Sequence, residues 1–208
     1  MKAGSWATMV RQLAAGGKLG RARGAAAGAE QLSNEQASSR QIGGQAESLK
    51  AWLQGISRMD MTWVTDRIAV GGGIWRAENM AAVARAGVTH IIDMQIEFDD
   101  TALAEPHGIE VLWNPIDDDF QPKPPAILQR GVDFATEALD QDGTRVFIHC
   151  AAGVHRAPMM TLAVLCSMGW AQEAAQELIE KRRPVVDFAD VYVRSVERFL
   201  DQQVRAGK

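Results

Sequence analysis

The sequence predicts an α/β domain in which a central sheet of about five strands is flanked by helices. Short apolar runs alternate with stretches whose apolar residues recur at helical spacing, a pattern typical of α/β layer folds. Glycine and proline mark the boundaries between these segments. The chain has 208 residues, 47% of them hydrophobic, so a domain of ~150 residues can bury enough apolar surface to fold alone.

Strands are predicted where short, β-rich apolar runs end at turn-forming or polar residues. They are expected over residues 63–64, 67–70, 88–94, 109–113 and 145–148. Three consecutive glycines at 71–73 close the second run. The runs at 88–94 and 145–148 are almost continuously apolar, which predicts strands in the buried part of the sheet.

Helices are predicted where apolar residues recur three or four positions apart. They are expected over residues 79–86, 100–105, 124–139, 159–166, 171–181 and 189–204. Gly87 caps the first of them, Pro106 stops the second and Pro124 opens the third. Gly169 marks the end of the fourth.

Residues 1–57 differ from the rest in composition. Ala, Gly, Gln and Ser dominate, and long apolar periodicity is missing, so we expect a low-complexity, disordered tail ahead of a domain over residues 58–208. Two other interpretations stay open. The segment is also compatible with an upstream extension translated ahead of a start at Met59 or Met61. Its first acid is Glu30, and an Arg- and Ala-rich start without acids is typical of transit peptides.

Composition and charge limit the partners, cofactors and cellular compartments that we expect for this protein. The net charge of −4 gives no argument for nucleic acid or for a membrane surface, and no run of eighteen apolar residues predicts a membrane span. The two cysteines, without a pairing pattern, favour a reducing compartment, so we expect a cytoplasmic protein or, through the N-terminus, an organellar one. No group of His, Cys and carboxylate residues has metal-ligand spacing, so neither a metal nor another cofactor is expected. The sequence leaves the oligomeric state open.

The segment His149-Cys150-Ala151-Ala152-Gly153-Val154-His155-Arg156-Ala157-Pro158 stands between a predicted strand and a predicted helix. Successive backbone N–H groups in such a loop form a concave anion site, and the helix N-terminus adds partial positive charge. Gly153 tolerates a positive φ and a close backbone approach. The phosphate-binding residues expected from this loop are Ala151, Ala152, Gly153, Val154, His155 and Arg156.

Cys150 and Arg156 are the reactive side chains of this segment. A helix N-terminus and a nearby guanidinium both stabilise a thiolate, the nucleophilic form of cysteine. The planar fork of Arg156 can hold two oxygens of a phosphoryl group. These features predict attack on phosphorus, which also needs a proton donor for the leaving oxygen. The acidic loop Asp117-Asp118-Asp119, after the strand at 109–113, offers three candidates.

His-Cys-x5-Arg after a strand, with an aspartate about thirty residues upstream, resembles the cysteine-dependent protein phosphatases, in particular the dual-specificity branch. The resemblance covers Trp63 to about Leu200. The pattern Cys-x-Ala-Gly-x-x-Arg-Ala-Pro is most similar to the phosphatases of regenerating liver and the plant glucan phosphatases, which have Gly where this chain has His155.

The resemblance implies Cys150 as nucleophile, Asp118 as general acid and base, and Arg156 with the loop N–H groups as phosphate ligands. It implies that His149 orients the loop, while a core histidine bonded to backbone is equally compatible. Most dual-specificity phosphatases have Ser or Thr at Ala157, where the hydroxyl assists release of the thiol. Without it we expect the phosphoenzyme to be longer-lived.

The resemblance leaves three functions open. The first is a phosphatase acting on phosphotyrosine and phosphoserine or phosphothreonine of a phosphorylated protein, or on a similar phosphomonoester. The second is a phosphatase for phosphorylated glucan or phosphoinositide on the same fold. The third is a slow, substrate-trapping binding module.

Other polar residues carry less specific expectations. The side chain of His155 is compatible with a solvent-facing rim or with substrate contact. Asp93 at a strand end is expected to be structural, and Lys181-Arg182-Arg183 a solvated charge run at a helix end. Cys166 lies sixteen residues after Cys150, within the following helix, and is expected in the core.

Overall fold

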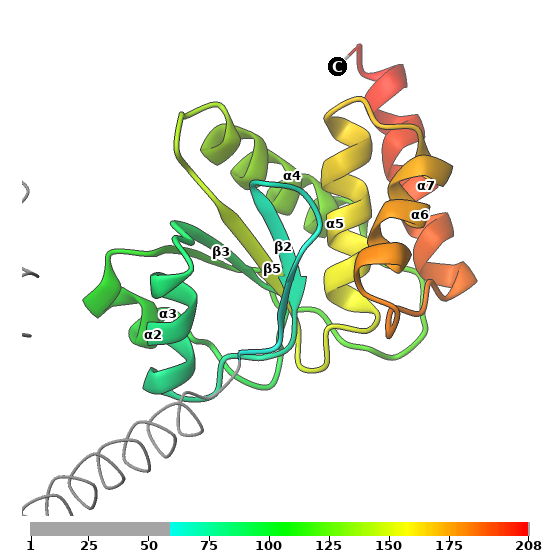
Figure 1. The fold of residues 1–208 in the computed structure, drawn as a ribbon. Helices are drawn as coiled ribbons and strands as arrows, with labels where there is room; N and C mark the ends of the chain where they lie inside the picture. Colours follow the sequence, from blue (N-terminus) through cyan, green and yellow to red (C-terminus); the bar gives the residue numbers. More distant parts are fainter. Residues whose placement is uncertain (1–58, 208) are drawn as a thin grey trace, which may run out of the picture. The chain divides into compact units, whose positions relative to one another are not determined.

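The structure is a computed structural model, and it describes residues 59–207 (Figure 1). The prediction of a tail over residues 1–57 therefore falls outside the described residues. Within residues 59–207, no helix is both long enough and apolar enough to cross a membrane.

Five strands form one mixed sheet, as the sequence predicts. They are β1 (Met61–Trp63), β2 (Ile68–Gly71), β3 (His90–Asp93), β4 (Glu110–Trp113) and β5 (Val146–His149). The order across the sheet is β1-β2-β5-β3-β4, with β1 antiparallel to β2 and every other neighbouring pair parallel. The central strand, β5, therefore lies between β2 and β3.

The register aligns the carboxyl ends of the four parallel strands. His149, the last residue of β5, is paired with Gly71 of β2 on one side and Asp93 of β3 on the other. Asp93 in turn pairs with Trp113 at the end of β4. The loops that follow these strands consequently start from one edge of the sheet, which is where ligands bind in open α/β sheets.

Helices cover both faces of the sheet (Figure 1). They are α2 (Ala77–Arg85), α3 (Thr101–Ala104), the short 3₁₀ helix η1 (Glu105–His107), α4 (Pro125–Leu139), α5 (Arg156–Ser167), α6 (Gln172–Arg182) and α7 (Asp190–Arg205). Helices α2 and α3 lie on one face, and α4 to α7 on the other. The predicted helix over 159–166 begins three residues earlier, at Arg156, which places the arginine in its first turn.

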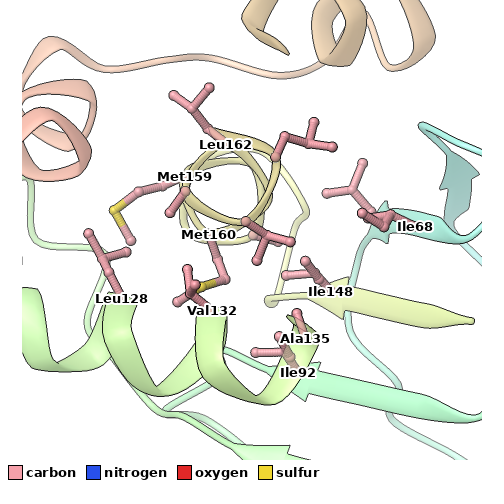
Figure 2. Packing of buried hydrophobic residues seen from close by; sticks show 14 of the residues in the cluster. Ile68, Ile92, Leu128, Val132, Ala135, Ile148, Met159, Met160 and Leu162 are labelled. Atoms are coloured by element: carbon pink, nitrogen blue, oxygen red, sulfur yellow. The ribbon is translucent and has the colours of Figure 1, made fainter. Parts of the chain in front are cut away.

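Two hydrophobic clusters, one on each face, hold the layers together. Phe147 faces the cluster beneath α2, whereas its neighbours Val146 and Ile148 face the larger cluster beneath α4 and α5, because side chains alternate along a strand. Helix α5 is buried along most of its length. Figure 2 shows Met160 of α5 pointing toward α4, beside Val132. The helix that follows residues 150–155, the cysteine loop, is thus fixed by the core.

Candidate active site

The loop between β5 and α5 is held with its carbonyl groups turned outward. Neighbouring donors bind four successive carbonyl oxygens of the loop. Gly73 N–H binds Ala151 O (3.1 Å), Arg183 Nη2 binds Ala152 O (3.2 Å), Arg183 Nε binds Gly153 O (2.9 Å), and Asp187 N–H binds Val154 O (3.0 Å). Because each peptide carbonyl points away, the following N–H group is turned toward the inside of the loop.

The thiol of Cys150 is bound by one of these N–H groups. Its Sγ accepts a hydrogen bond from Gly153 N–H at 3.3 Å, and the residue is 1% exposed. The N–H groups of Ala151, Ala152, Val154 and His155 have no acceptor within residues 59–207. A concave set of free donors around a sulfur atom is suited to a tetrahedral oxyanion. The structure therefore brings the predicted phosphate-binding residues together.

Gly153 is required in this loop for two reasons. Its φ is 64°, in the left-handed region that favours glycine. A Cβ at this position would lie 2.4 Å from the carbonyl carbon of Gly71 and 2.6 Å from Nη2 of Arg183. The loop thus packs against the end of β2 closely enough to exclude any side chain.

Arg156 is buried, and most of its guanidinium is already bound. Its Nη1 and Nη2 donate to the two carboxylate oxygens of Glu97 at 3.0 and 2.8 Å, and Nη1 also donates to Ile116 O at 3.0 Å. Hydrogen bonding from Arg156 lowers the pKa of Glu97. Nε of Arg156 is buried without a hydrogen-bond partner. That donor is therefore available to a bound anion.

Asp118 faces Arg156 from the loop between β4 and α4. Its Oδ2 lies 3.8 Å from Nε of Arg156 and 3.0 Å from Nδ1 of His155, while its Oδ1 accepts a hydrogen bond from the hydroxyl of Tyr192 at 2.8 Å. Burial, followed by this hydrogen bond to Asp118, raises the pKa of Tyr192 to about 12. The structure thus places the predicted acid beside the predicted phosphate ligand.

The two flanking aspartates are turned to other partners. Asp117 caps the backbone N–H of Asp118 at 2.8 Å, and Asp119 binds Gln121 N–H at 3.0 Å. Asp119 also forms an ion pair with the buried Lys123, which lowers the pKa of Asp119. The role of Asp118 stays a prediction, and neither neighbour shares its contacts with the cysteine loop.

His149 belongs to a buried polar cluster beneath the loop. Its Nε2 lies 3.0 Å from Asp100 and 3.8 Å from Asp93, and all three side chains are fully buried. Burial, opposed by the charge of His149, raises the pKa of Asp93 to about 7. Within residues 59–207, the ligand atoms of Asp93, Asp100 and His149 lie close enough together to hold a metal ion. Sequence spacing could not reveal it, since Asp93 and His149 come from different strands.

Arg183 differs from its sequence-based expectation, and His155 has partners that the sequence did not reveal. The His155 side chain contacts Asp118 and Asp187, and its contact with substrate stays a prediction. Arg183 is 5% exposed, so the prediction of a solvated charge run is wrong for this residue. The reason is that α6 ends at Arg182, and the extended backbone of Arg183 turns its guanidinium toward the loop and onto Asp60 at 2.6 Å.

Glu97 and Tyr192 are site residues that the sequence did not reveal. Glu97 lies in the loop after β3, and Tyr192 lies in the first turn of α7, far along the chain from Cys150. An acceptor for Arg156 could have been anticipated, because buried arginines need partners. Nothing in the local sequence identifies which acid supplies it.

Comparison with known proteins agrees with this geometry. The sequence profile of the family described as dual specificity phosphatase, catalytic domain, matches residues 74–202. Protein phosphatase Slingshot homolog 3 of Rattus norvegicus is 28% identical over 131 residues, which are 62% of this chain and 19% of that protein. Protein tyrosine phosphatase type IVA 2 of Mus musculus is 33% identical over 98 residues, 47% of this chain and 58% of that protein. The chain thus spans less than two thirds of the length of either relative.

Solved structures with the same fold cover most of the chain. The crystal structure of PTPMT1 in complex with PI(5)P has a TM-score of 0.64 at 21% identity, covering 72% of this chain and 99% of its own. Human DUSP28 has a TM-score of 0.59 at 19% identity, covering 69% and 94%. At these identities the likeness establishes the fold and not the substrate.

Proposed function

The chain belongs to the dual specificity phosphatase catalytic domain family, and from that premise we propose that it hydrolyses phosphate monoesters through a cysteinyl-phosphate intermediate. One observation carries the proposal. The Cys150 thiol accepts Gly153 N–H in a loop whose carbonyls are turned outward, and the Nε of Arg156, which has no hydrogen-bond partner, lies 3.8 Å from the carboxyl of Asp118.

In the first step the Cys150 thiolate attacks phosphorus. The S–P bond forms as the P–O bond to the leaving group breaks, and Asp118 protonates the leaving oxygen. The loop N–H groups and Nε of Arg156 hold the three equatorial oxygens of the transition state. Glu97 keeps the guanidinium in a fixed plane by binding its other edge.

In the second step water attacks the same phosphorus. Asp118, now ionised, accepts a proton from the water as the O–P bond forms and the S–P bond breaks, which restores the thiolate. Ala157 provides no hydroxyl to assist this release, so we expect the second step to be slow. The proposed chemistry uses side chains of this chain alone and requires a reducing compartment such as the cytoplasm.

The proposed substrates are phosphotyrosine and phosphoserine or phosphothreonine residues of proteins, the range that the family name describes. A second candidate is a phosphoinositide. Three exposed apolar side chains lie at or just after the strand ends that lead to the site: Trp75, Ile96 and Trp113 are 47%, 55% and 43% exposed. Apolar side chains in such a position can contact the lipid surface from which an inositol phosphate projects. The fold neighbour PTPMT1 was solved with PI(5)P.

Release of phosphate from a phosphopeptide panel and from vesicles containing PI(5)P would separate the two candidates. Trp75→Ala supplies the diagnostic variant. If the lipid is the substrate, we expect this change to lower the rate on vesicles and not on a soluble aryl phosphate. No release of phosphate from these vesicles by wild type would remove the phosphoinositide candidate, whereas equal rates for wild type and variant would remove only the role of Trp75.

Cys150→Ser tests the nucleophile. The hydroxyl stays protonated at neutral pH, so turnover of an aryl phosphate should fall below a few per cent of wild type, while the loop still binds phosphate. Cys166→Ser, which changes the other free cysteine, is the matched control and should keep its rate. Hydrolysis by Cys150→Ser above a few per cent would contradict the assignment.

Asp118→Asn tests the acid. Substrates with poor leaving groups need the proton most, so their kcat/KM should fall by roughly 10²-fold or more, and that of good leaving groups much less. Asp117→Asn and Asp119→Asn are the controls, because those carboxylates bind other partners. If Asp117→Asn proved the more damaging change for poor leaving groups, the acid would be assigned to the wrong aspartate.

A further inference from the structure

His155 joins three separate segments of the chain through one imidazole ring. Its Nδ1 lies 3.0 Å from Oδ2 of Asp118 in the acidic loop, and its Nε2 lies 3.5 Å from Oδ2 of Asp187 in the loop before α7. The ring also meets Phe120 edge-on at 5.1 Å between centroids. The side chain is therefore held on the acidic loop, although its backbone belongs to the cysteine loop.

Both oxygens of the Asp118 carboxyl are consequently engaged. Oδ1 accepts the hydroxyl proton of Tyr192, and that hydroxyl in turn accepts Phe120 N–H at 3.0 Å. Phe120 has a φ of 55°, an uncommon conformation for a residue other than glycine, and one found mainly where the surroundings enforce it. Since Oδ1 is occupied by a donor, a transferable proton belongs on Oδ2, the oxygen that faces His155 and Arg156.

We propose that His155 is a positioning residue that fixes Asp118 over the cysteine loop and shares with it the proton that the reaction uses. The inference rests on the proposed function. Its basis is the single contact between Nδ1 and Oδ2, which can hold one proton as carboxylic acid and imidazole or as carboxylate and imidazolium.

The proton balance follows from this pair. In the first step the leaving oxygen takes the proton from Oδ2 of Asp118, and when that proton resides on Nδ1 of His155 it returns to Oδ2 during the transfer. In the second step the attacking water gives one proton to Oδ2, which restores the pair. No proton donor outside the pair and the water is required.

The charged and titratable groups around the ring come from every neighbouring segment. Cys150 belongs to the cysteine loop, Arg156 begins α5, and Asp187 flanks Nε2. Tyr192 stands on α7, and Lys123, which is paired with Asp119, lies over the Tyr192 ring at 5.2 Å from its centroid. Two carboxylates, Asp118 and Asp187, thus flank the imidazole.

The test measures kcat/KM as a function of pH for two substrates. Phenyl phosphate has a poor leaving group, and 4-nitrophenyl phosphate has a better one. In His155→Ala the ratio of poor to good substrate should fall at least tenfold, because the acid loses its orientation. His155→Asn places an amide donor near the Nδ1 position and should restore part of the ratio. Because asparagine cannot carry the proton, the rate on phenyl phosphate should decline at lower pH than in wild type.

Two further variants complete the experiment. Tyr192→Phe removes the other hydrogen bond to Asp118 in an otherwise isosteric side chain and should lower the same ratio. It is the variant to measure if His155→Ala does not fold. His107→Asn, an exposed histidine on η1, is the matched control and should leave the ratio and the pH profile unchanged.

Equal losses on both substrates would overturn the inference, because a merely structural role in the loop affects them alike. An unchanged ratio in His155→Ala would overturn it as well. If wild type hydrolysed neither substrate, the proposed function would fail and this inference with it. If wild type were active and the ratio of kcat/KM for the poor to the good substrate were the same in His155→Ala, only the role of His155 would be removed.

Discussion

Arg156 combines two tasks that depend on different edges of one guanidinium. Its Nη atoms bind Glu97 and the backbone oxygen of Ile116, which fixes the plane of the group. Its Nε is left as a buried donor beside Asp118. A guanidinium can do both at once because its donors lie in a rigid planar fork, whereas an ammonium group is a single point charge.

Arg156→Lys should therefore lower kcat/KM far more than a substitution that keeps the positive charge would suggest. The lysine cannot bind Glu97 on two atoms and also reach a phosphoryl oxygen, so we expect a loss of about 2–4 kcal/mol in transition-state binding, or roughly 30- to 1000-fold in kcat/KM for an aryl phosphate. Arg85→Lys, at the exposed end of α2, is the control. A change of less than threefold in Arg156→Lys would show that the arginine does not hold the phosphoryl group.

Among the elements, the end of α6 matters to the cysteine loop although it is distant in sequence. Arg183 leaves the helix and donates to Ala152 O and Gly153 O, while Asp60 ahead of β1 binds the same guanidinium. These bonds turn two carbonyls outward, and the loop N–H groups face inward as a result. The shape of the anion site thus depends on Arg183 at the end of α6 and on Asp60 ahead of β1.

Arg183→Met should loosen the loop while leaving the hydrophobic core in place. Two carbonyls lose charged donors, so the free energy of unfolding should fall by about 2–3 kcal/mol, and kcat/KM and phosphate affinity should fall together by roughly tenfold or more. Denaturant unfolding and aryl phosphate kinetics measure these effects. Arg182→Met, the exposed neighbour, is the control. Full activity in Arg183→Met would mean that the loop keeps its shape without this tether.

The elements themselves could be predicted from the sequence, because each depends on local features. The apolar run before His149, the glycine at 153 and the spacing of the apolar residues in α5 identify the strand, loop and helix around Cys150. The residues that brace this loop could not be predicted. Arg183, Glu97 and Tyr192 reach it only through the tertiary arrangement, and each looks like an ordinary surface or helix residue in the sequence.

Across the whole molecule, the alignment of strand ends creates both the site and a buried charge cluster. The register that sets His149 beside Gly71 and Asp93 starts the cysteine loop at the same edge as the loop carrying Glu97. It also buries Asp93, Asp100 and His149 directly beneath that loop. A polar cluster at this depth ties the stability of the fold to pH.

Asp93 determines whether the stability of the fold rises or falls with pH. Burial raises its pKa from 3.8 to about 7, so between these values the folded state keeps a proton that the unfolded chain releases. The stability that this proton contributes is complete below pH 4 and is lost as pH rises through 7. Asp119 and Glu97, whose pKa values are lowered, act in the opposite direction only at acidic pH. These two carboxylates therefore do not contribute between pH 5 and pH 8, and a comparison of wild type with a variant of Asp93 isolates Asp93 in this window.

In Asp93→Asn the fall in the free energy of unfolding between pH 5 and pH 8 should be smaller than in wild type, by on the order of 2 kcal/mol. Asparagine retains an oxygen that can accept Gln95 N–H, as Oδ1 of Asp93 does at 2.8 Å, and it does not ionise. Denaturant unfolding at both pH values gives the difference, with the exposed Asp142→Asn as control. Equal pH slopes in Asp93→Asn and wild type would show that Asp93 is already ionised in the folded protein at pH 5, despite its complete burial.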